Sequence, residues 1–127
     1  MVGNIIQITP FMHIDNVARA VDFFTNTLGF KCLIHVRDYA YVEREGAGIR
    51  IQSHADPAEL GTAHQGFAYY VDVHDLDAIL AELGPKLAAL PTGDVRGPVD
   101  QSYGQRELMI RAPDGNLVVF GQAIAAA

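Results

Sequence analysis

A group of charged residues in the stretch YGQRELMIRAPDGNLVVFGQ (103–122) could support acid–base chemistry. Its carboxylates are Glu107 and Asp114, and its cations are Arg106 and Arg111. Apolar residues alternate with polar ones on both sides of the PDGN sequence (113–116), which is typical of two strands joined by a tight turn. Gly115 or Asn116 is expected to take a positive φ there, and Asp114 is predicted to be a turn residue rather than an acid catalyst. Most of the stretch is therefore predicted to be scaffold.

The remaining residues with reactive side chains do not form a standard catalytic motif. The histidines, at positions 13, 35, 54, 64 and 74, form no HxH or i, i+4 pair, and we expect them to make hydrogen bonds at the surface. The single cysteine, Cys32, excludes an internal disulfide and a multi-cysteine zinc site, and it is expected to be a small buried residue in a reducing cytoplasm. No Ser-His-Asp order or glycine-rich phosphate loop is present.

Composition limits the classes of protein and partner. The chain has 127 residues, half of them hydrophobic, which suits one domain with a real core. Its formal net charge of −6, with nine basic residues spread along the chain, argues against a nucleic-acid partner and would suit a neutral or cationic ligand. No apolar run approaches the roughly 20 residues of a membrane helix, and no signal peptide is recognised, so a cytoplasmic location without membrane contact is expected.

Hydrophobic periodicity predicts the same order of elements twice. The first set is a strand at 4–14, a helix at 15–30 with Asp15 as N-cap, and strands at 31–37, 39–45 and 48–54. The second is a strand at 67–73, a helix at 75–90 capped by Asp75 and ended or broken by Gly84-Pro85, and strands at 92–99, 106–112 and 116–122. The fold class is thus α+β, a single domain of two βαβββ modules (about 4–54 and 67–122) joined by a polar linker at 55–66. We expect the modules to pair into a curved mixed sheet around a cavity.

Two segments of this pattern resemble a known family. HIDNVARAVDFFTNTLGF (13–30) and the stretch 103–122 are similar to the helix and hairpin motifs of the vicinal-oxygen-chelate superfamily, which includes glyoxalase I, extradiol dioxygenases and bleomycin-resistance proteins. The hairpin looks closest to that of bleomycin-resistance proteins, although Tyr103 stands where those often have tryptophan and Ala112 where they often have aspartate. The resemblance implies a paired βαβββ fold.

The resemblance also allows a test for a metal site. Metal-using members carry His, Glu or Gln ligands at positions that fall here on Thr9, Arg50 (or Gln52), Ala68 (or Phe67) and Val119. None of the best-aligned positions offers a good ligand, and Arg50 would repel a cation. We therefore expect no metal and no other cofactor. The alternative is a metal-dependent lyase, isomerase or dioxygenase that uses non-standard ligands such as His13, Gln52 or His54.

Strand parity assigns side chains to faces. Ile8, Met12 and Ile14 are expected beneath the helices, with Thr9, Phe11 and His13 toward the cavity. The residues predicted to bind a ligand form an aromatic and apolar wall with polar handles: Phe11, Tyr39 (or Tyr41), Arg50, Gln52, Tyr70, Tyr103, Glu107 and Met109. This composition is typical of a small-molecule pocket.

Together these features favour binding over catalysis. Bleomycin-resistance proteins are dimers whose subunits form two crevices that trap a planar, cationic antibiotic, and the resemblance makes Tyr39 and Tyr103 the candidate stacking residues. Asp72, Asp100 and Glu107 are candidate cation partners, and the alternative role of each carboxylate is solubility or a local salt bridge. The leading hypothesis is a non-enzymatic homodimer that sequesters a small molecule, aromatic or cationic and of the bleomycin-like antibiotic class, and so confers antibiotic resistance. A partner-binding or regulatory module on the same fold is a third hypothesis.

Overall fold

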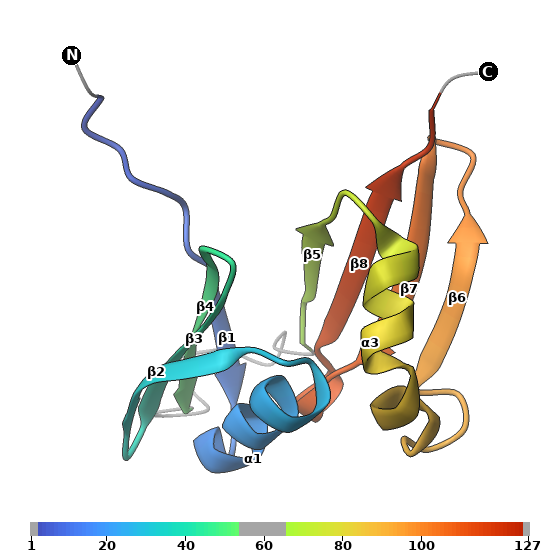
Figure 1. The fold of residues 1–127 in the computed structure, drawn as a ribbon. Helices are drawn as coiled ribbons and strands as arrows, with labels where there is room; N and C mark the ends of the chain where they lie inside the picture. Colours follow the sequence, from blue (N-terminus) through green and yellow to red (C-terminus); the bar gives the residue numbers. More distant parts are fainter. Residues whose placement is uncertain (1–2, 54–65, 126–127) are drawn as a thin grey trace.

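The structure, a computed structural model, describes residues 3–53 and 66–125 and contains two four-stranded sheets (Figure 1). Sheet A consists of β1 (Phe11–Ile14), β2 (Lys31–Val36), β3 (Tyr39–Arg44) and β4 (Ala47–Ser53), in the order β1-β4-β3-β2. Sheet B consists of β5 (Ala68–Asp72), β6 (Val95–Asp100), β7 (Gln105–Arg111) and β8 (Leu117–Ala123), in the order β5-β8-β7-β6. In each sheet the first strand pairs in parallel with the last, and the other pairs are antiparallel. The predicted α+β fold of two βαβββ modules is confirmed.

The first helical segment starts one residue later than predicted. Asn16, not Asp15, is the N-cap: its side-chain oxygen accepts from the Arg19 N–H at 3.1 Å. Helix α1 (Val17–Asp22) continues into the π-helical segment η1 (Phe23–Thr27). The Asp15 N–H donates to the Asp114 carboxylate, at 2.6 Å, and so ties the residue before the cap to the hairpin of the second module.

The second helix begins at its predicted N-cap, Asp75, and continues beyond the predicted break at Gly84-Pro85. Asp75 caps α3 (Leu76–Ala88) by accepting from the Ala78 N–H at 3.1 Å. The prediction that Gly84-Pro85 ends or breaks the helix is wrong, because the helix contains Pro85 and runs on to Ala88. Leu87, beyond the proline, is buried on the same stripe as Leu76 and Leu83, and this packing offsets the hydrogen bond that proline removes.

One hydrophobic core serves both modules. Its sheet A side includes Met12, Val42 and Ile51, and its sheet B side includes Leu108, Ile110, Val118 and Phe120. The helical segments contribute Phe24, Leu28, Leu76 and Leu83 to the same cluster, and α3 packs against η1. The helices therefore lie between the sheets (Figure 1), and each sheet turns its other face outward. We call these outward faces the open face of sheet A and the open face of sheet B.

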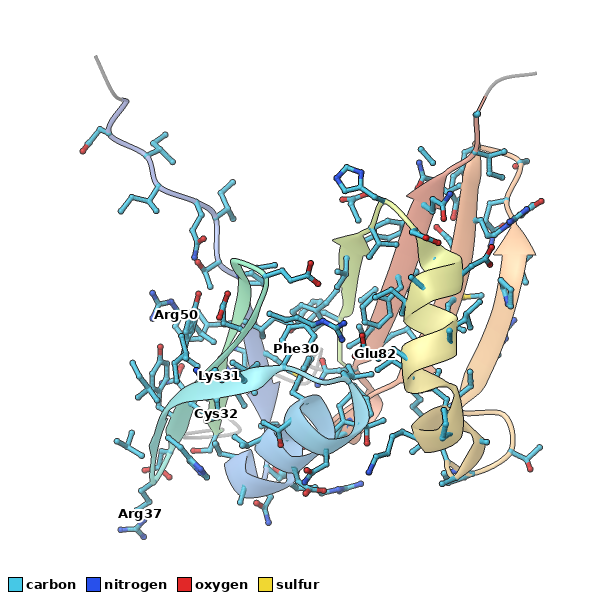
Figure 2. The ribbon with its side chains drawn as sticks, viewed as in Figure 1. Phe30, Lys31, Cys32, Arg37, Arg50 and Glu82 are labelled. Atoms are coloured by element: carbon cyan, nitrogen blue, oxygen red, sulfur yellow. The ribbon has the colours of Figure 1, made fainter. Side chains whose placement is uncertain are left out.

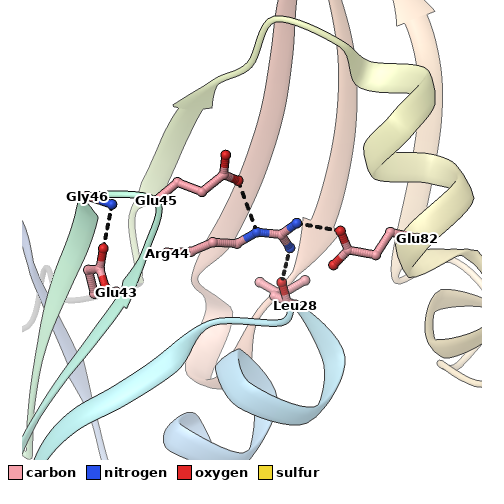
Figure 3. Close-up of polar contacts among 6 residues, drawn as sticks. All are labelled: Leu28, Glu43, Arg44, Glu45, Gly46 and Glu82. Carbon is pink, nitrogen blue, oxygen red and sulfur yellow. Dashed lines mark hydrogen bonds and ion pairs between the residues drawn. The ribbon is translucent and has the colours of Figure 1, made fainter.

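An ion pair fixes one module against the other (Figure 3). Arg44, at the end of β3, donates through Nη2 to Glu82 Oε1 on α3 at 2.5 Å. Its Nη1 donates to the main-chain oxygen of Leu28 at 2.9 Å, which satisfies a carbonyl at the end of the first helical segment. Glu82 raises the pKa of Arg44 through this hydrogen bond. One side chain thus joins a strand, a helix end and the second module.

The N-terminal segment departs most from the prediction. A strand was expected over 4–14, but only Phe11–Ile14 pair with β4, and the preceding residues project away from both sheets (Figure 1). Met12 and Ile14 lie in the core as predicted, whereas Ile8 is 94% exposed rather than buried under the helices. The hydrogen bonding between β1 and β4 begins at Pro10, whose main-chain oxygen accepts from the Arg50 N–H at 3.0 Å. We call residues 3–10 the N-terminal arm.

The hairpin before β8 forms as a short 3-10 turn, η2 (Pro113–Gly115). Gly115 has the predicted positive φ of 76°, and Asp114 also takes a positive φ, of 59°. Asn116 does not; its φ is −73°, because its buried side chain is held by three main-chain groups. The predicted linker at 55–66 lies outside the described residues, except for Gly66. His54 and His64 also lie outside them.

Candidate ligand-binding faces

The predicted ligand-binding residues divide between the two open faces. The open face of sheet A carries Phe11, Tyr39, Arg50 and Gln52, and the open face of sheet B carries Tyr70, Glu107 and Met109, with Tyr103 just before β7. Since both sheets turn their other faces toward the common core, one chain does not bring the two groups together. The sequence predicted a single aromatic wall. The structure instead has two separate groups of ligand-binding candidates, one on each open face, which we call the half-walls.

On the open face of sheet A, two tyrosines orient Arg50. Its Nη1 donates to the Tyr39 hydroxyl at 2.5 Å, and its guanidinium carbon lies 5.3 Å from the centre of the Tyr41 ring. Phe11, the register neighbour of Arg50 on β1, is 47% exposed and stacks on His13 with 6.2 Å between ring centres. Figure 2 shows Arg50 on the side of sheet A away from Glu82 and the helix that carries it.

On the open face of sheet B, tyrosines surround a buried carboxylate. Glu107 is only 4% exposed, and its Oε2 accepts from the Tyr103 hydroxyl at 2.7 Å. This hydrogen bond raises the pKa of Tyr103, whose ring remains 64% exposed. The Tyr70 hydroxyl donates to Gln105 Oε1 at 3.0 Å, and burial of the hydroxyl, with a smaller effect of Glu107, raises the pKa of Tyr70 to about 12. Within the described residues Glu107 has no cationic partner.

Glycines make room for one tyrosine on each open face. A Cβ at Gly121 would collide with the Tyr70 hydroxyl, and a Cβ at Gly48 would collide with that of Tyr41. Each ring therefore lies flat against its sheet, diagonally across from the glycine on the neighbouring strand. The sequence analysis did not identify these glycines, although a glycine inside a strand is a known signal of close approach by another group.

A cleft of about 490 Å³ separates the sheets where β5 approaches the N-terminal arm and the start of β4. Its lining includes Ile8, Pro10, Phe30, Gly48, Tyr70 and Asp72. The Tyr69 hydroxyl bridges the modules by donating to the Phe11 oxygen at 2.7 Å, and its burial raises the pKa of Tyr69 to about 12. Among the described strands, β1 and β5 share no ladder, so the two sheets remain separate.

The described residues do not fit a metal ion of the kind that some relatives of this fold use. Within them, no three His, Cys, Asp or Glu side chains come together in a way that could hold one. His13 and Gln52 are register partners, but Arg50 lies next to them on the same face, held by Tyr39 and Tyr41. A cation at this position would be repelled by the guanidinium.

Two residues join the modules in a way that was not predicted from the sequence: Arg44, described above, and Asn116, which was expected only as a turn residue. Asn116 is 1% exposed, accepts from the Phe67 N–H at 3.0 Å and donates to the His13 oxygen at 3.3 Å. Its position after the PDG turn was visible in the sequence, but its partners belong to distant segments. Neither role follows from local periodicity.

Two βαβββ modules on one core, with aromatic open faces, define a paired-module α+β protein. The chain belongs to the Glyoxalase/Bleomycin resistance protein/Dioxygenase superfamily, whose family model matches residues 7–120. A search of curated proteins finds no match to the sequence. None of the helices in the described parts of the chain has the length and apolar character needed to cross a membrane.

Solved structures share the fold at low sequence identity. A bleomycin-binding protein from bleomycin-producing Streptomyces verticillus, complexed with copper(II)-bleomycin, is similar with a TM-score of 0.72 and 24% identity, over 98% of this chain and 100% of that one. A bleomycin-binding protein complexed with bleomycin has a TM-score of 0.72 and 19% identity, over 93% and 98%. TnmS3, an antibiotic binding protein from Streptomyces sp. CB03234, has a TM-score of 0.67 and 22% identity, over 95% and 99%.

Proposed function

We propose that this protein binds and sequesters a planar aromatic small molecule, of the bleomycin-like antibiotic class, as a non-enzymatic homodimer in the cytoplasm. The observation that carries the proposal is the open face of sheet B, where Tyr103 and Tyr70 expose ring surface while hydrogen bonds hold their hydroxyls. Rings that are fixed before the ligand arrives lose little conformational entropy on stacking. Glu107 beneath them offers a buried negative charge to a cationic group of the ligand.

Binding rather than catalysis is favoured by the chemistry of the open faces. The buried carboxylate of Glu107 is engaged by a tyrosine, and no nucleophile and base of the described residues are paired on the same face. The three similar solved structures described above are bleomycin-binding or antibiotic-binding proteins. A cytoplasmic location is supported by the single cysteine, which leaves the chain without an internal disulfide.

A dimer is supported by the placement of the half-walls and by the N-terminal arm. Each open face points away from the other, so a second copy is needed to enclose a ligand between a sheet A face and a sheet B face. Ile6 and Ile8 continue the core-facing row of Met12 and Ile14, yet they are 95% and 94% exposed. An apolar row of this kind is typical of a segment that another chain covers.

The test is a titration with bleomycin followed by thermal unfolding. A ligand that binds only the native state, at 100 times its dissociation constant, adds roughly 2.7 kcal/mol of stability. We expect Tyr103→Ala to weaken binding at least about tenfold and to lower the stability of the free protein by about 1–3 kcal/mol, because it also removes the hydroxyl that donates to the buried Glu107 carboxylate. Ile124→Ala, which truncates an exposed apolar side chain outside both faces, is the control. Absence of any shift with bleomycin-class compounds would contradict antibiotic sequestration.

A further inference from the structure

We infer that Arg50 forms an oxyanion-binding subsite on the open face of sheet A, so that the ligand carries a carboxylate, sulfonate or similar oxyanion on or beside its aromatic group. The inference rests on the proposed function, because it assigns one more chemical group to the molecule that the protein binds. The net charge of the chain suggests a neutral or cationic ligand. The Arg50 subsite adds that this ligand also carries one anionic group.

The guanidinium of Arg50 is held in place before any ligand arrives. Its Nη1 donates to the Tyr39 hydroxyl at 2.5 Å, and the Tyr41 ring lies 5.3 Å beneath its carbon. Tyr41 in turn is seated on the sheet because Gly48 leaves it room. The side chain is half-buried, so its freedom to rotate into solvent is reduced. A fixed fork of donors is the geometry that carboxylates and phosphates recognise.

No described carboxylate compensates the charge of Arg50. In the described parts of the chain the half-buried arginines are Arg44, Arg50 and Arg106. Arg44 is paired with Glu82 and Arg106 with Asp100, whereas no carboxylate of residues 3–53 and 66–125 lies within ion-pair distance of Arg50. A half-buried cation has lost part of its hydration, and an anionic partner would recover that free energy.

The neighbouring acidic group does not supply this partner. Glu43 lies on the same face of β3, two residues from Tyr41, but its carboxylate accepts from the Gly46 N–H in its own turn (Figure 3). Nη2 and Nε of Arg50 make no hydrogen bond within the described residues, so they are available to an incoming oxyanion. The half-exposed ring of Phe11 lies in register beside them and offers a surface for an attached aromatic group.

The test compares two fluorescent probes that differ by one sulfonate group. 8-Anilinonaphthalene-1-sulfonate carries the oxyanion, and N-phenyl-1-naphthylamine has the same rings without it. Both are titrated into the full-length wild-type protein and into Arg50→Gln, with the unfolding midpoint of each protein recorded. Arg37→Gln is the matched control, because Arg37 is an exposed arginine in the turn between β2 and β3 and its replacement changes the net charge equally (Figure 2).

We expect Arg50→Gln to weaken binding of the sulfonate probe by about tenfold, the effect of one charge-assisted hydrogen bond, and to leave the neutral probe unchanged. Arg37→Gln should change neither. The inference is overturned if Arg50→Gln binds the sulfonate probe like wild type, if it weakens both probes equally, or if Arg37→Gln has the same effect. It is also overturned if Arg50→Gln instead dissociates a dimer, since a carboxylate of the second copy would then neutralise Arg50.

Failure of the sulfonate probe to bind the wild-type protein would equally overturn the oxyanion subsite. It would leave the proposed function standing, because the bleomycin titration with Tyr103→Ala tests the open face of sheet B independently. Conversely, a negative bleomycin titration together with Arg50-dependent binding of the sulfonate probe would reject the proposed antibiotic class and retain the subsite.

Discussion

The side-chain amide of Asn116 donates to the main-chain oxygen of His13 at 3.3 Å, which joins the last hairpin of the chain to its first strand. The amide also donates to the Pro113 oxygen at 3.0 Å, and its own oxygen accepts from the Phe67 N–H at 3.0 Å. All of this takes place at a residue that is 1% exposed. Asn116 is thus a buried polar contact between the modules, and its contribution to stability can be measured.

Asn116→Ala should lower the free energy of unfolding by about 2–4 kcal/mol, because it leaves main-chain groups without partners in a buried site. The measurement is urea unfolding followed by circular dichroism. Asn4→Ala is the control, since Asn4 is exposed on the N-terminal arm, and it should change stability by less than about 0.5 kcal/mol. Equal stability of the two variants would mean that the hairpin is held by its apolar neighbours alone.

Arg44 and Glu82 should show a small, salt-dependent coupling energy across the module interface. Because half of the Glu82 side chain is exposed, Glu82→Gln is expected to cost only about 0.5–1 kcal/mol. Arg44→Met should cost more than Glu82→Gln, since it also removes the donor to the Leu28 oxygen. A double-mutant cycle at low and high salt measures the pair separately. A cycle energy of zero at low salt would assign the effect of Arg44 to its other partners, the Leu28 oxygen and the Glu45 carboxylate.

The raised pKa values of Tyr69 and Tyr70 predict a loss of stability at high pH. Burial raises the pKa of both Tyr69 and Tyr70 from 10.0 to about 12, so the folded state holds these protons more tightly than the unfolded chain does. The resulting stabilisation is complete below pH 10 and is lost as the pH rises through the folded-state pKa of about 12. Ultraviolet absorbance of tyrosinate should show Tyr69 and Tyr70 ionising later than in the unfolded chain, and Tyr69→Phe and Tyr70→Phe should each remove one of these late contributions.

The titration has an internal control in the protein unfolded by urea, where all tyrosines should ionise near their ordinary pKa. If Tyr69→Phe leaves the late phase unchanged, then the Tyr69 hydroxyl is not buried against the Phe11 oxygen as the structure has it. The same comparison for Tyr70 reports on the open face of sheet B.

The exposed isoleucine row predicts that the N-terminal arm contributes to the dimer. Ile6→Lys combined with Ile8→Lys should raise the dimer dissociation constant at least about 100-fold, since burial of each isoleucine contributes about 1.5–3 kcal/mol. Gln7→Lys combined with Thr9→Lys adds the same charge on the opposite row and should have a much smaller effect. Sedimentation velocity over a range of protein concentrations is the measurement. A wild-type protein that remains monomeric throughout would refute both the dimer and the role of the arm.

Local pattern was sufficient for much of the fold. The alternation in β4 and β7, the apolar stripe of α3 and the cap at Asp75 follow from residues within a few positions of one another, and the structure has them as predicted. The extension of α3 past Pro85 was missed because the burial of Leu87 depends on a core shared with distant elements. Asp15 was expected to cap the first helix, but Asn16 is the cap, and the Asp15 N–H donates to Asp114 from the other end of the chain.

The sequence by itself determined which residues of each strand share a face, because side-chain direction alternates with a period of two wherever a strand forms. It therefore placed Arg50 with Gln52, and Glu107 with Met109, on the faces turned away from the helices. Only the tertiary structure decided that these faces point apart, that Ile8 has no core to enter, and that Arg50 has no carboxylate near it within the described residues. Those outcomes depend on how two modules pack on a single core, and packing between distant segments leaves no periodic signal in the chain.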